Sequence, residues 1–157
     1  MEEKQKKILI VDDEPSIVKL ASVKLKNEGF EVEEAYNGKE ALEKVAKSKP
    51  DLIILDIMMP IMDGKEVRKA LRQSEETKKI PVIILTALGE FEEQLKSLGE
   101  EGVTEYLTKP FDPKELTNMA KMILGGEKDE ELEKLKHKKE AKLRTIVDIM
   151  HRKQGES

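Results

Sequence analysis

The chain of 157 residues is long enough for one ordinary domain and an appendage, and too short for a second full domain. Its 29 basic and 33 acidic residues give a net charge of −4, so it lacks the basic excess that attracts nucleic acid. The absence of cysteine excludes disulfides and thiolate metal sites. The apolar runs are too short for a bilayer, and the start, MEEKQKK, lacks a signal's apolar stretch. We therefore expect a cytoplasmic protein with neither nucleic acid nor membrane as partner.

Short apolar or alternating segments recur along the chain and predict five strands. In chain order they are Ile8–Val11, Glu31–Ala35, Leu52–Leu55, Val82–Leu85 and Val103–Leu107. The intervals between them show helical spacing and are long enough for crossover helices. The first, third and fourth runs are continuously apolar, as in parallel strands covered on both faces. The pattern predicts an α/β fold with a parallel sheet between helices.

Residues typical of helix starts and ends agree with this division into strands and helices. Pro15 lies at an expected helix start, Gly29 follows the last periodic residue of that helix, and Pro113 opens the last helix of the domain. The glycine pair at 125–126 precedes a highly charged segment. We therefore expect a domain over residues 1–125 and a helical extension over residues 126–157.

Polar side chains stand at or just after the carboxyl ends of the predicted buried strands. They are Asp12, Asp13, Asp56, Thr86 and Lys109. Because the carboxyl ends of parallel strands share one edge of an open sheet, where ligands bind, these residues are expected to be neighbours. Taken singly each has an ordinary explanation: Asp13 as a helix cap, Thr86 as a strand-end residue, Lys109 as an exposed lysine. Their joint occurrence favours a site.

Carboxylates that converge in this way raise one another's pKa unless a cation neutralises them. Oxygen ligands without His or Cys favour Mg²⁺, which keeps several waters and leaves a position for a phosphate oxygen. We expect Asp13 and Asp56 to bind the ion directly and Asp12 to act through water. Asp56 is then the predicted nucleophile that accepts a phosphoryl group, with Lys109 supplying positive charge and Thr86 a hydroxyl donor.

The same residues stand in motifs that resemble the receiver domain of response regulators, the two-component signalling proteins, over roughly residues 6–124. The stretches that carry the resemblance are ILIVDDEP, LIILDIMMPIMDG, ILTA and YLTKPF. The resemblance implies a doubly wound, flavodoxin-like sheet of five parallel strands in the order 2-1-3-4-5, with helices on both faces. It also implies a phosphohistidine donor, and hence a sensor histidine kinase as partner.

Site residues follow from the resemblance position by position. It implies that Mg²⁺, or Mn²⁺ in its place, is held by Asp12, Asp13, Asp56 and the backbone carbonyl of Met58. It implies that the phosphoryl group on Asp56 contacts Thr86, the backbone of Ala87, and Lys109. Thr86 and Tyr106 would form the conformational switch. A cis bond between Lys109 and Pro110 would help to aim the lysine.

This interpretation makes the chain a signalling phospho-acceptor that catalyses only its own phosphorylation and dephosphorylation. Two outputs remain open: a diffusible regulator that binds an unknown protein target, and an intermediate in a phosphorelay. A homodimer through the face of the fourth helix, fifth strand and fifth helix, or through the C-terminal helix, is a further expectation.

Three other interpretations are less consistent with the residues. An aspartate-nucleophile phosphatase would have its nucleophile after the first strand and a second Asp two residues later, where Met58 stands relative to Asp56. A flavin carrier needs exposed amides after the first strand, but Asp12, Asp13 and Glu14 would repel its phosphate. A degenerate scaffold receiver is disfavoured because no chemical position has been lost.

The segment after residue 126 predicts an amphipathic helix over 129–152. Its apolar positions are Leu132, Leu135, Leu143, Ile146, Val147 and Met150. The segment is too short for a DNA-binding output domain. Its helix either docks or dimerises under the control of phosphorylation, or packs on its own receiver.

Overall fold

The computed structural model describes residues 5–60, 62–87 and 105–125. The expected helix over 129–152 lies outside the described residues, as does the predicted start of the fifth strand at Val103. The described chain alternates strands and helices up to β4. The elements are β1 (Lys7–Val11), α1 (Pro15–Asn27), β2 (Glu31–Ala35), α2 (Gly38–Ser48), β3 (Leu52–Asp56), α3 (Gly64–Arg72), β4 (Val82–Ala87), β5 (Glu105–Lys109) and α5 (Pro113–Leu124).

The five strands form one parallel sheet in the order β2-β1-β3-β4-β5, as predicted. Several strands run further than the apolar runs indicated, because a parallel ladder pairs backbone groups whatever the side chains are. Asp56 pairs with Leu85, and Ala87 pairs with Lys109. Asp56 and Lys109 are therefore the last residues of their strands, and Thr86 lies within β4.

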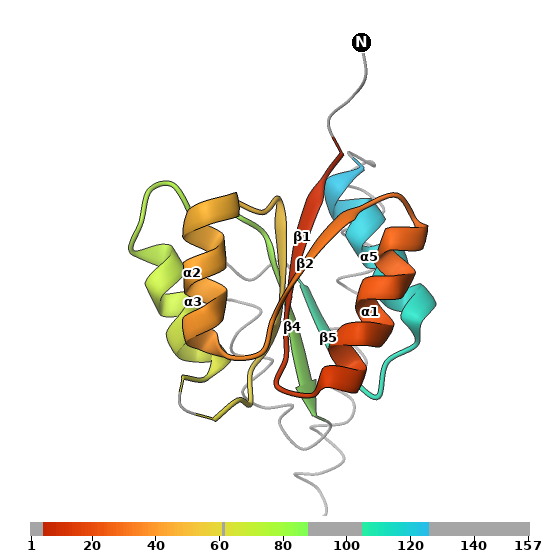
Figure 1. The fold of residues 1–157 in the computed structure, drawn as a ribbon, viewed down its shortest axis with the longest axis horizontal. Coiled ribbons are helices and arrows are strands. Elements are labelled where there is room, and N and C mark those ends of the chain that lie inside the picture. The colour runs from red at the N-terminus through yellow and green to blue at the C-terminus, as the bar shows by residue number, and fades with distance from the viewer. Residues whose placement is uncertain (1–4, 61, 88–104, 126–157) are drawn as a thin grey trace, which may run out of the picture.

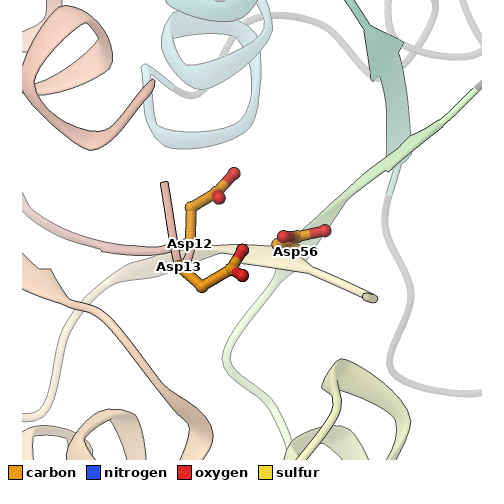
Figure 2. Close-up of side chains that lie close together, drawn as sticks. All are labelled: Asp12, Asp13 and Asp56. Carbon is orange, nitrogen blue, oxygen red and sulfur yellow. The ribbon is translucent and has the colours of Figure 1, made fainter. Parts of the chain in front are cut away.

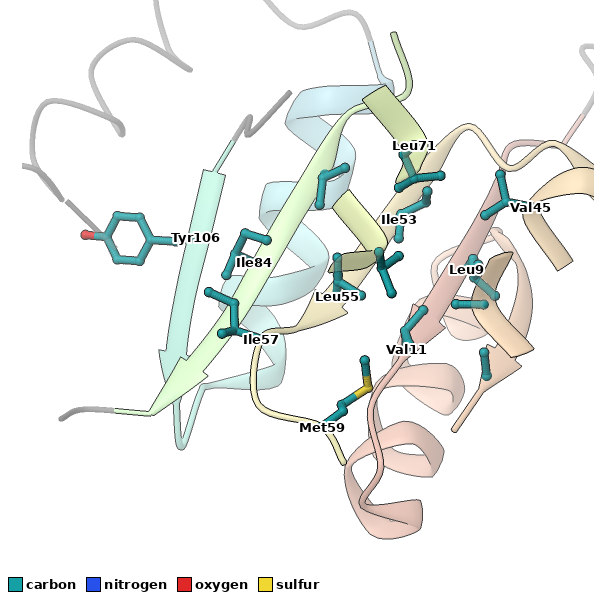
Figure 3. Packing of buried hydrophobic residues seen from close by; sticks show 14 residues of the cluster. Leu9, Val11, Val45, Ile53, Leu55, Ile57, Met59, Leu71, Ile84 and Tyr106 are labelled. Carbon is teal, nitrogen blue, oxygen red and sulfur yellow. The ribbon is translucent and has the colours of Figure 1, made fainter. Parts of the chain in front are cut away.

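Helices cover both faces of the sheet, with α1 and α5 on one side and α2 and α3 on the other (Figure 1). The side chains of β1 alternate between the two sides, as the strand period of two requires. Ile8 and Ile10 pack in the cluster with residues of α1 and α5, while Leu9 and Val11 pack with residues of α2 and α3. Figure 3 shows the second of these clusters, into which α2 contributes Val45. Both faces of the central strands are buried, which explains their continuously apolar sequence.

The helix boundaries follow the expected punctuation. Pro15 and Pro113 are the first residues of α1 and α5, and the Asp112 carboxylate accepts a hydrogen bond from the Lys114 backbone N–H at 2.9 Å. Gly29 follows α1 with a φ of +96°, a conformation that a side chain would strain. Asp13 does not cap α1: the N-cap is Glu14, and no side chain bonds to the helix start there. Asp13 is therefore left available for the site.

Candidate metal and phosphoryl site

The sheet brings the predicted site residues to its carboxyl edge. Asp12 and Asp13 directly follow β1, and Asp56 ends β3, the strand next to β1. The Asp12 Oδ1 atom accepts a hydrogen bond from the Glu14 backbone N–H at 2.9 Å, which turns the chain towards α1. The Asp56 Oδ1 atom accepts one from the Met58 backbone N–H at 3.1 Å. Each carboxylate is thus fixed by the loop that follows it.

The carboxylates of Asp12, Asp13 and Asp56 form a compact acidic cluster. One oxygen of each lies within 4.8 Å of the others. Figure 2 shows the three side chains gathered where β1 and β3 end. Asp12 and Asp56 are buried, with 0% and 3% of their surfaces exposed, whereas Asp13 is exposed. The cluster therefore has a buried floor and one side open to solvent.

Lys109 reaches into this cluster from the end of β5. Its Nζ lies 2.6 Å from Asp12 Oδ2, 3.4 Å from Asp56 Oδ2 and 3.6 Å from Glu14 Oε1. The bond between Lys109 and Pro110 is cis, as expected. One ammonium group thus neutralises part of the charge of several carboxylates, and it lies beside the Oδ2 atom of Asp56, the predicted acceptor.

The crowding of charge shifts the pKa values of Asp56 and Lys109. Burial and, next in size, the Asp12 carboxylate raise the pKa of the Asp56 carboxyl from 3.8 to about 7, against the opposing effects of Lys109 and the Met58 N–H. Burial lowers the pKa of Lys109, but its contacts with Asp12, Asp56 and Glu14 outweigh that effect and leave the pKa raised. A single lysine therefore does not fully compensate the cluster.

The residues present fit a divalent cation. All the ligand atoms of the cluster are carboxylate oxygens, which hard cations such as Mg²⁺ prefer. Apart from the ion pair with Lys109, the buried Asp12 Oδ2 has no hydrogen-bond donor among the described residues. A cation at this point would satisfy that oxygen and remove the repulsion that raises the pKa of Asp56.

Replacing Asp56 with asparagine is expected to change how stability depends on pH in the metal-free protein. The folded-state pKa of Asp56 is raised to about 7, so Asp56 costs the folded state no stability below its ordinary pKa of 3.8. The cost grows as the pH rises and is complete above about 7, where the carboxyl is ionised in the folded state as well. The advantage of Asp56→Asn over wild type in the free energy of unfolding should therefore shrink by about 2 kcal/mol between about pH 8 and about pH 5, with allowance for solvent screening.

Urea unfolding with a chelator at both pH values measures this difference. Asp63→Asn is the matched control, because Asp63 caps α3 and asparagine caps a helix equally well. If the difference in the free energy of unfolding between Asp56→Asn and wild type stays constant with pH, the surroundings of Asp56 do not disfavour its ionised form.

The remaining predicted residues lie at the same edge of the sheet. Thr86 is fully buried in β4, and the backbone of Ala87 pairs with Lys109. Tyr106 of β5 has 6% of its surface exposed, so this residue of the expected switch is buried in the structure. Since β4 places Val82 and Ile84 on the α2 and α3 side, Thr86 shares that side, and Tyr106 belongs to the same cluster.

Two residues near the site were not assigned a role from the sequence. Glu14 contacts the Lys109 ammonium group, and the run of acids from Asp12 to Glu14 was the available signal. Gly64 begins α3, and a Cβ atom there would lie 2.5 Å from the Asp56 carbonyl oxygen. An Asp–Gly pair is typical of a turn and gives no signal of this contact.

The fold and the strand-end site define a receiver domain, and comparison with known proteins agrees. The profile of the response regulator receiver domain matches residues 8–121. The chain therefore belongs to the response regulator receiver family.

Individual relatives support this family assignment. The chain is 47% identical over 119 residues to the alkaline phosphatase synthesis transcriptional regulatory protein PhoP of Bacillus subtilis, covering 76% of this chain and 48% of the relative. It is 44% identical over 119 residues to the phosphate regulon regulatory protein PhoB of Pseudomonas aeruginosa, covering 76% and 52%. The chain thus spans about half the length of these curated relatives.

Two solved structures match over nearly their whole length. A response regulator structure from Chloroflexus aurantiacus superposes with a TM-score of 0.72 at 38% identity, covering 78% of this chain and 99% of the other. The chemotaxis response regulator CheY4 of Vibrio cholerae gives a TM-score of 0.68 at 38% identity, covering 77% and 100%. Among the described residues, no helix combines the length and apolar character needed to cross a membrane.

Proposed function

We propose that this receiver accepts a phosphoryl group from the phosphohistidine of a sensor kinase onto Asp56. The observation that carries the proposal is the placement of Lys109 Nζ, 3.4 Å from Asp56 Oδ2 and 2.6 Å from Asp12 Oδ2, beside three converging carboxylates. In the transfer, an Asp56 oxygen forms a bond to phosphorus while the P–N bond of the donor breaks, and its electron pair stays on the imidazole nitrogen. Phosphoryl transfer depends chiefly on positioning and charge neutralisation, which these residues supply.

The proposed metal ligands are Asp12, Asp13, Asp56 and the backbone carbonyl of Met58, with Mg²⁺ as the expected ion and Mn²⁺ as a substitute. When bound, such an ion neutralises charge on the carboxylates and on the transferred phosphoryl oxygens. The Lys109 ammonium group and the backbone N–H of Ala87 would contact the other phosphoryl oxygens. The Met58 side chain is itself exposed, so it lies at the surface of the protein next to the site.

The proposed output is a change of surface transmitted by Thr86 and Tyr106. Their side chains share one side of the sheet on neighbouring strands, so a movement of the Thr86 hydroxyl towards the phosphoryl group would alter the space available to the Tyr106 ring. Such a shift requires phosphorylation to favour one of two arrangements energetically. The surface near β5 and α5 would then bind a protein target or a second copy of the chain.

We further propose that the chain acts in the cytoplasm as a signalling switch and turns over no external substrate. The relatives include transcriptional regulators, and RpaA of Synechocystis is described as DNA-binding, but only about half of the length of these relatives is matched. For the present chain, a kinase and a protein target are the proposed partners, without nucleic acid or membrane. The role of residues 126–157 as a docking or packing helix belongs to the same proposal.

A small phosphodonor such as acetyl phosphate tests the proposal without knowledge of the kinase. Incubated with Mg²⁺, wild type should gain the mass of one phosphoryl group, and both Asp56→Ala and wild type with a chelator should gain none. Asp51→Ala is a suitable control, since Asp51 accepts a hydrogen bond from Lys7 at the opposite edge of the sheet. A gain of mass by folded Asp56→Ala equal to that of wild type would contradict the assignment. Turnover of generic phosphate esters would instead favour a phosphatase.

A further inference from the structure

The loop between β3 and α3 is held at two places by glycines whose lack of a side chain permits close backbone contact. At Gly64, a Cβ atom would lie 2.5 Å from the Asp56 carbonyl oxygen and 2.8 Å from Ile57 Cα. At Gly38, the first residue of α2, it would lie 2.7 Å from the Met62 carbonyl oxygen. Each distance is shorter than a real side chain tolerates, so a side chain at either position requires the loop or the helix that carries the glycine to shift.

Hydrogen bonds connect the described residues of the loop to one another and to α3. The Gly64 N–H donates to the Ile57 carbonyl oxygen at 2.9 Å, and the Met62 N–H donates to the Pro60 carbonyl oxygen at 2.8 Å. The Asp63 carboxylate accepts a hydrogen bond from the Glu66 N–H at 2.9 Å, which fixes the loop to α3. A displacement at Met62 would therefore be passed towards the part of the loop beside Asp56.

Gly38 is not explained by its backbone conformation. Among the described glycines only Gly29 has a positive φ, and Gly38 sits in ordinary helical geometry. Alanine forms helices better than glycine, so helix formation alone would favour alanine at this position. What Gly38 does provide is room: an added Cβ would also lie 2.8 Å from Val67 Cγ2 on α3.

We propose that Gly38 is a positioning residue for the metal site, although it belongs to a helix that contributes no ligand. The close contact between the start of α2 and Met62 sets the position of the loop that carries the Met58 carbonyl. This inference rests on the proposed function, because it assumes that Met58 helps to hold the ion. It makes the packing of α2 against the loop a determinant of metal affinity.

The direct test compares Gly38→Ala with Lys39→Ala. Lys39 is the neighbouring, exposed residue in the same first turn of α2, so its replacement changes the helix without adding an atom towards Met62. Gly38→Ala should weaken Mg²⁺ binding by about tenfold, in the lower range for the loss of a group that supports metal ligands. Lys39→Ala should bind as wild type. Calorimetric titration gives the affinities, and unfolding with a chelator gives the stability separately.

A merely structural role would lower the unfolding temperature of Gly38→Ala and leave its affinity for Mg²⁺ unchanged, and that result would overturn the inference. The double variant Gly38→Ala with Val67→Ala relieves one of the contacts and should recover part of the affinity. If the double variant does not regain affinity for Mg²⁺, the loss of affinity arises from the contact with the Met62 backbone, which is the contact proposed here.

A measurement on wild type covers the case in which Gly38→Ala does not fold. In an NMR titration with Mg²⁺, the amide signals of Gly38 and Met62 should shift with the same midpoint as that of Met58. Signals of Met58 and Gly64 that move while those of Gly38 and Met62 stay fixed would overturn the inference and leave the proposed function intact. Absence of any Mg²⁺-dependent shift at Asp56 and Met58 would instead contradict the proposed function itself.

Discussion

Replacement of Lys109 with alanine should slow phosphorylation by acetyl phosphate about 100- to 1,000-fold at saturating Mg²⁺, the effect typical of losing one preorganised charge or donor at a transferring group. The reason is the position of its ammonium group, 3.4 Å from Asp56 Oδ2 and largely shielded from water. Single-turnover rates followed by intact mass measure the effect. Lys109→Arg should retain part of the rate, because it keeps the charge but not the shape of the ammonium group.

Lys114→Ala is the matched control for this prediction. Lys114 is an exposed lysine in the first turn of α5, near the same edge of the sheet, and it makes no ion pair with the acidic cluster among the described residues. It should react at the wild-type rate. A Lys109→Ala protein that is phosphorylated as fast as wild type would mean that Lys109 only balances the charge of Asp12, and that phosphoryl transfer does not use it.

Replacement of Asp13 with asparagine should weaken Mg²⁺ binding by about 100-fold, equivalent to about 3 kcal/mol. Asp13 lies in the acidic cluster but is exposed, and it does not cap α1. Its charge can therefore be removed at little cost to folding, so a change in affinity reports on ligation. Calorimetry or NMR titration with Mg²⁺ measures the change.

Asp112→Asn controls for a general loss of negative charge at this edge of the sheet. Asp112 caps α5, and asparagine is as good a cap, so the fold should be unaffected. Its affinity for Mg²⁺ should equal that of wild type. If Asp13→Asn also binds as tightly as wild type, Asp13 is not a ligand and the ion must be held without it, by the buried carboxylates and the Met58 carbonyl.

The arrangement of the sheet was predictable because its cause is local and repeated. The continuous run Leu52–Leu55 can be buried on both faces only in a strand between two layers of helices, and the structure places it there. The position of the site was predictable for a related reason. Polar residues such as Asp12 and Asp56 are tolerated next to such strands only at their ends, and parallel strands bring those ends together.

The details of the site depend on contacts between distant segments, and sequence patterns carry little information about them. The sequence indicated that Lys109 supplies positive charge, but not that it lies closer to Asp12 than to Asp56. It did not distinguish Asp13 as a ligand from Asp13 as a helix cap, because both interpretations suit an acid before Pro15. The contact of Gly64 with the Asp56 carbonyl oxygen arises from the packing of α3 against β3 and has no local signature.

Chemical trapping tests most directly whether Asp56 is the residue that carries the phosphoryl group. Wild type treated with acetyl phosphate and Mg²⁺ is reduced with borohydride, which converts an aspartyl phosphate to homoserine, and the peptides are then sequenced by mass spectrometry. The account predicts homoserine at position 56, dependent on both phosphodonor and Mg²⁺. Homoserine at position 12 or 13 with aspartate retained at 56, or a stable phosphoryl group on another residue type, would contradict it.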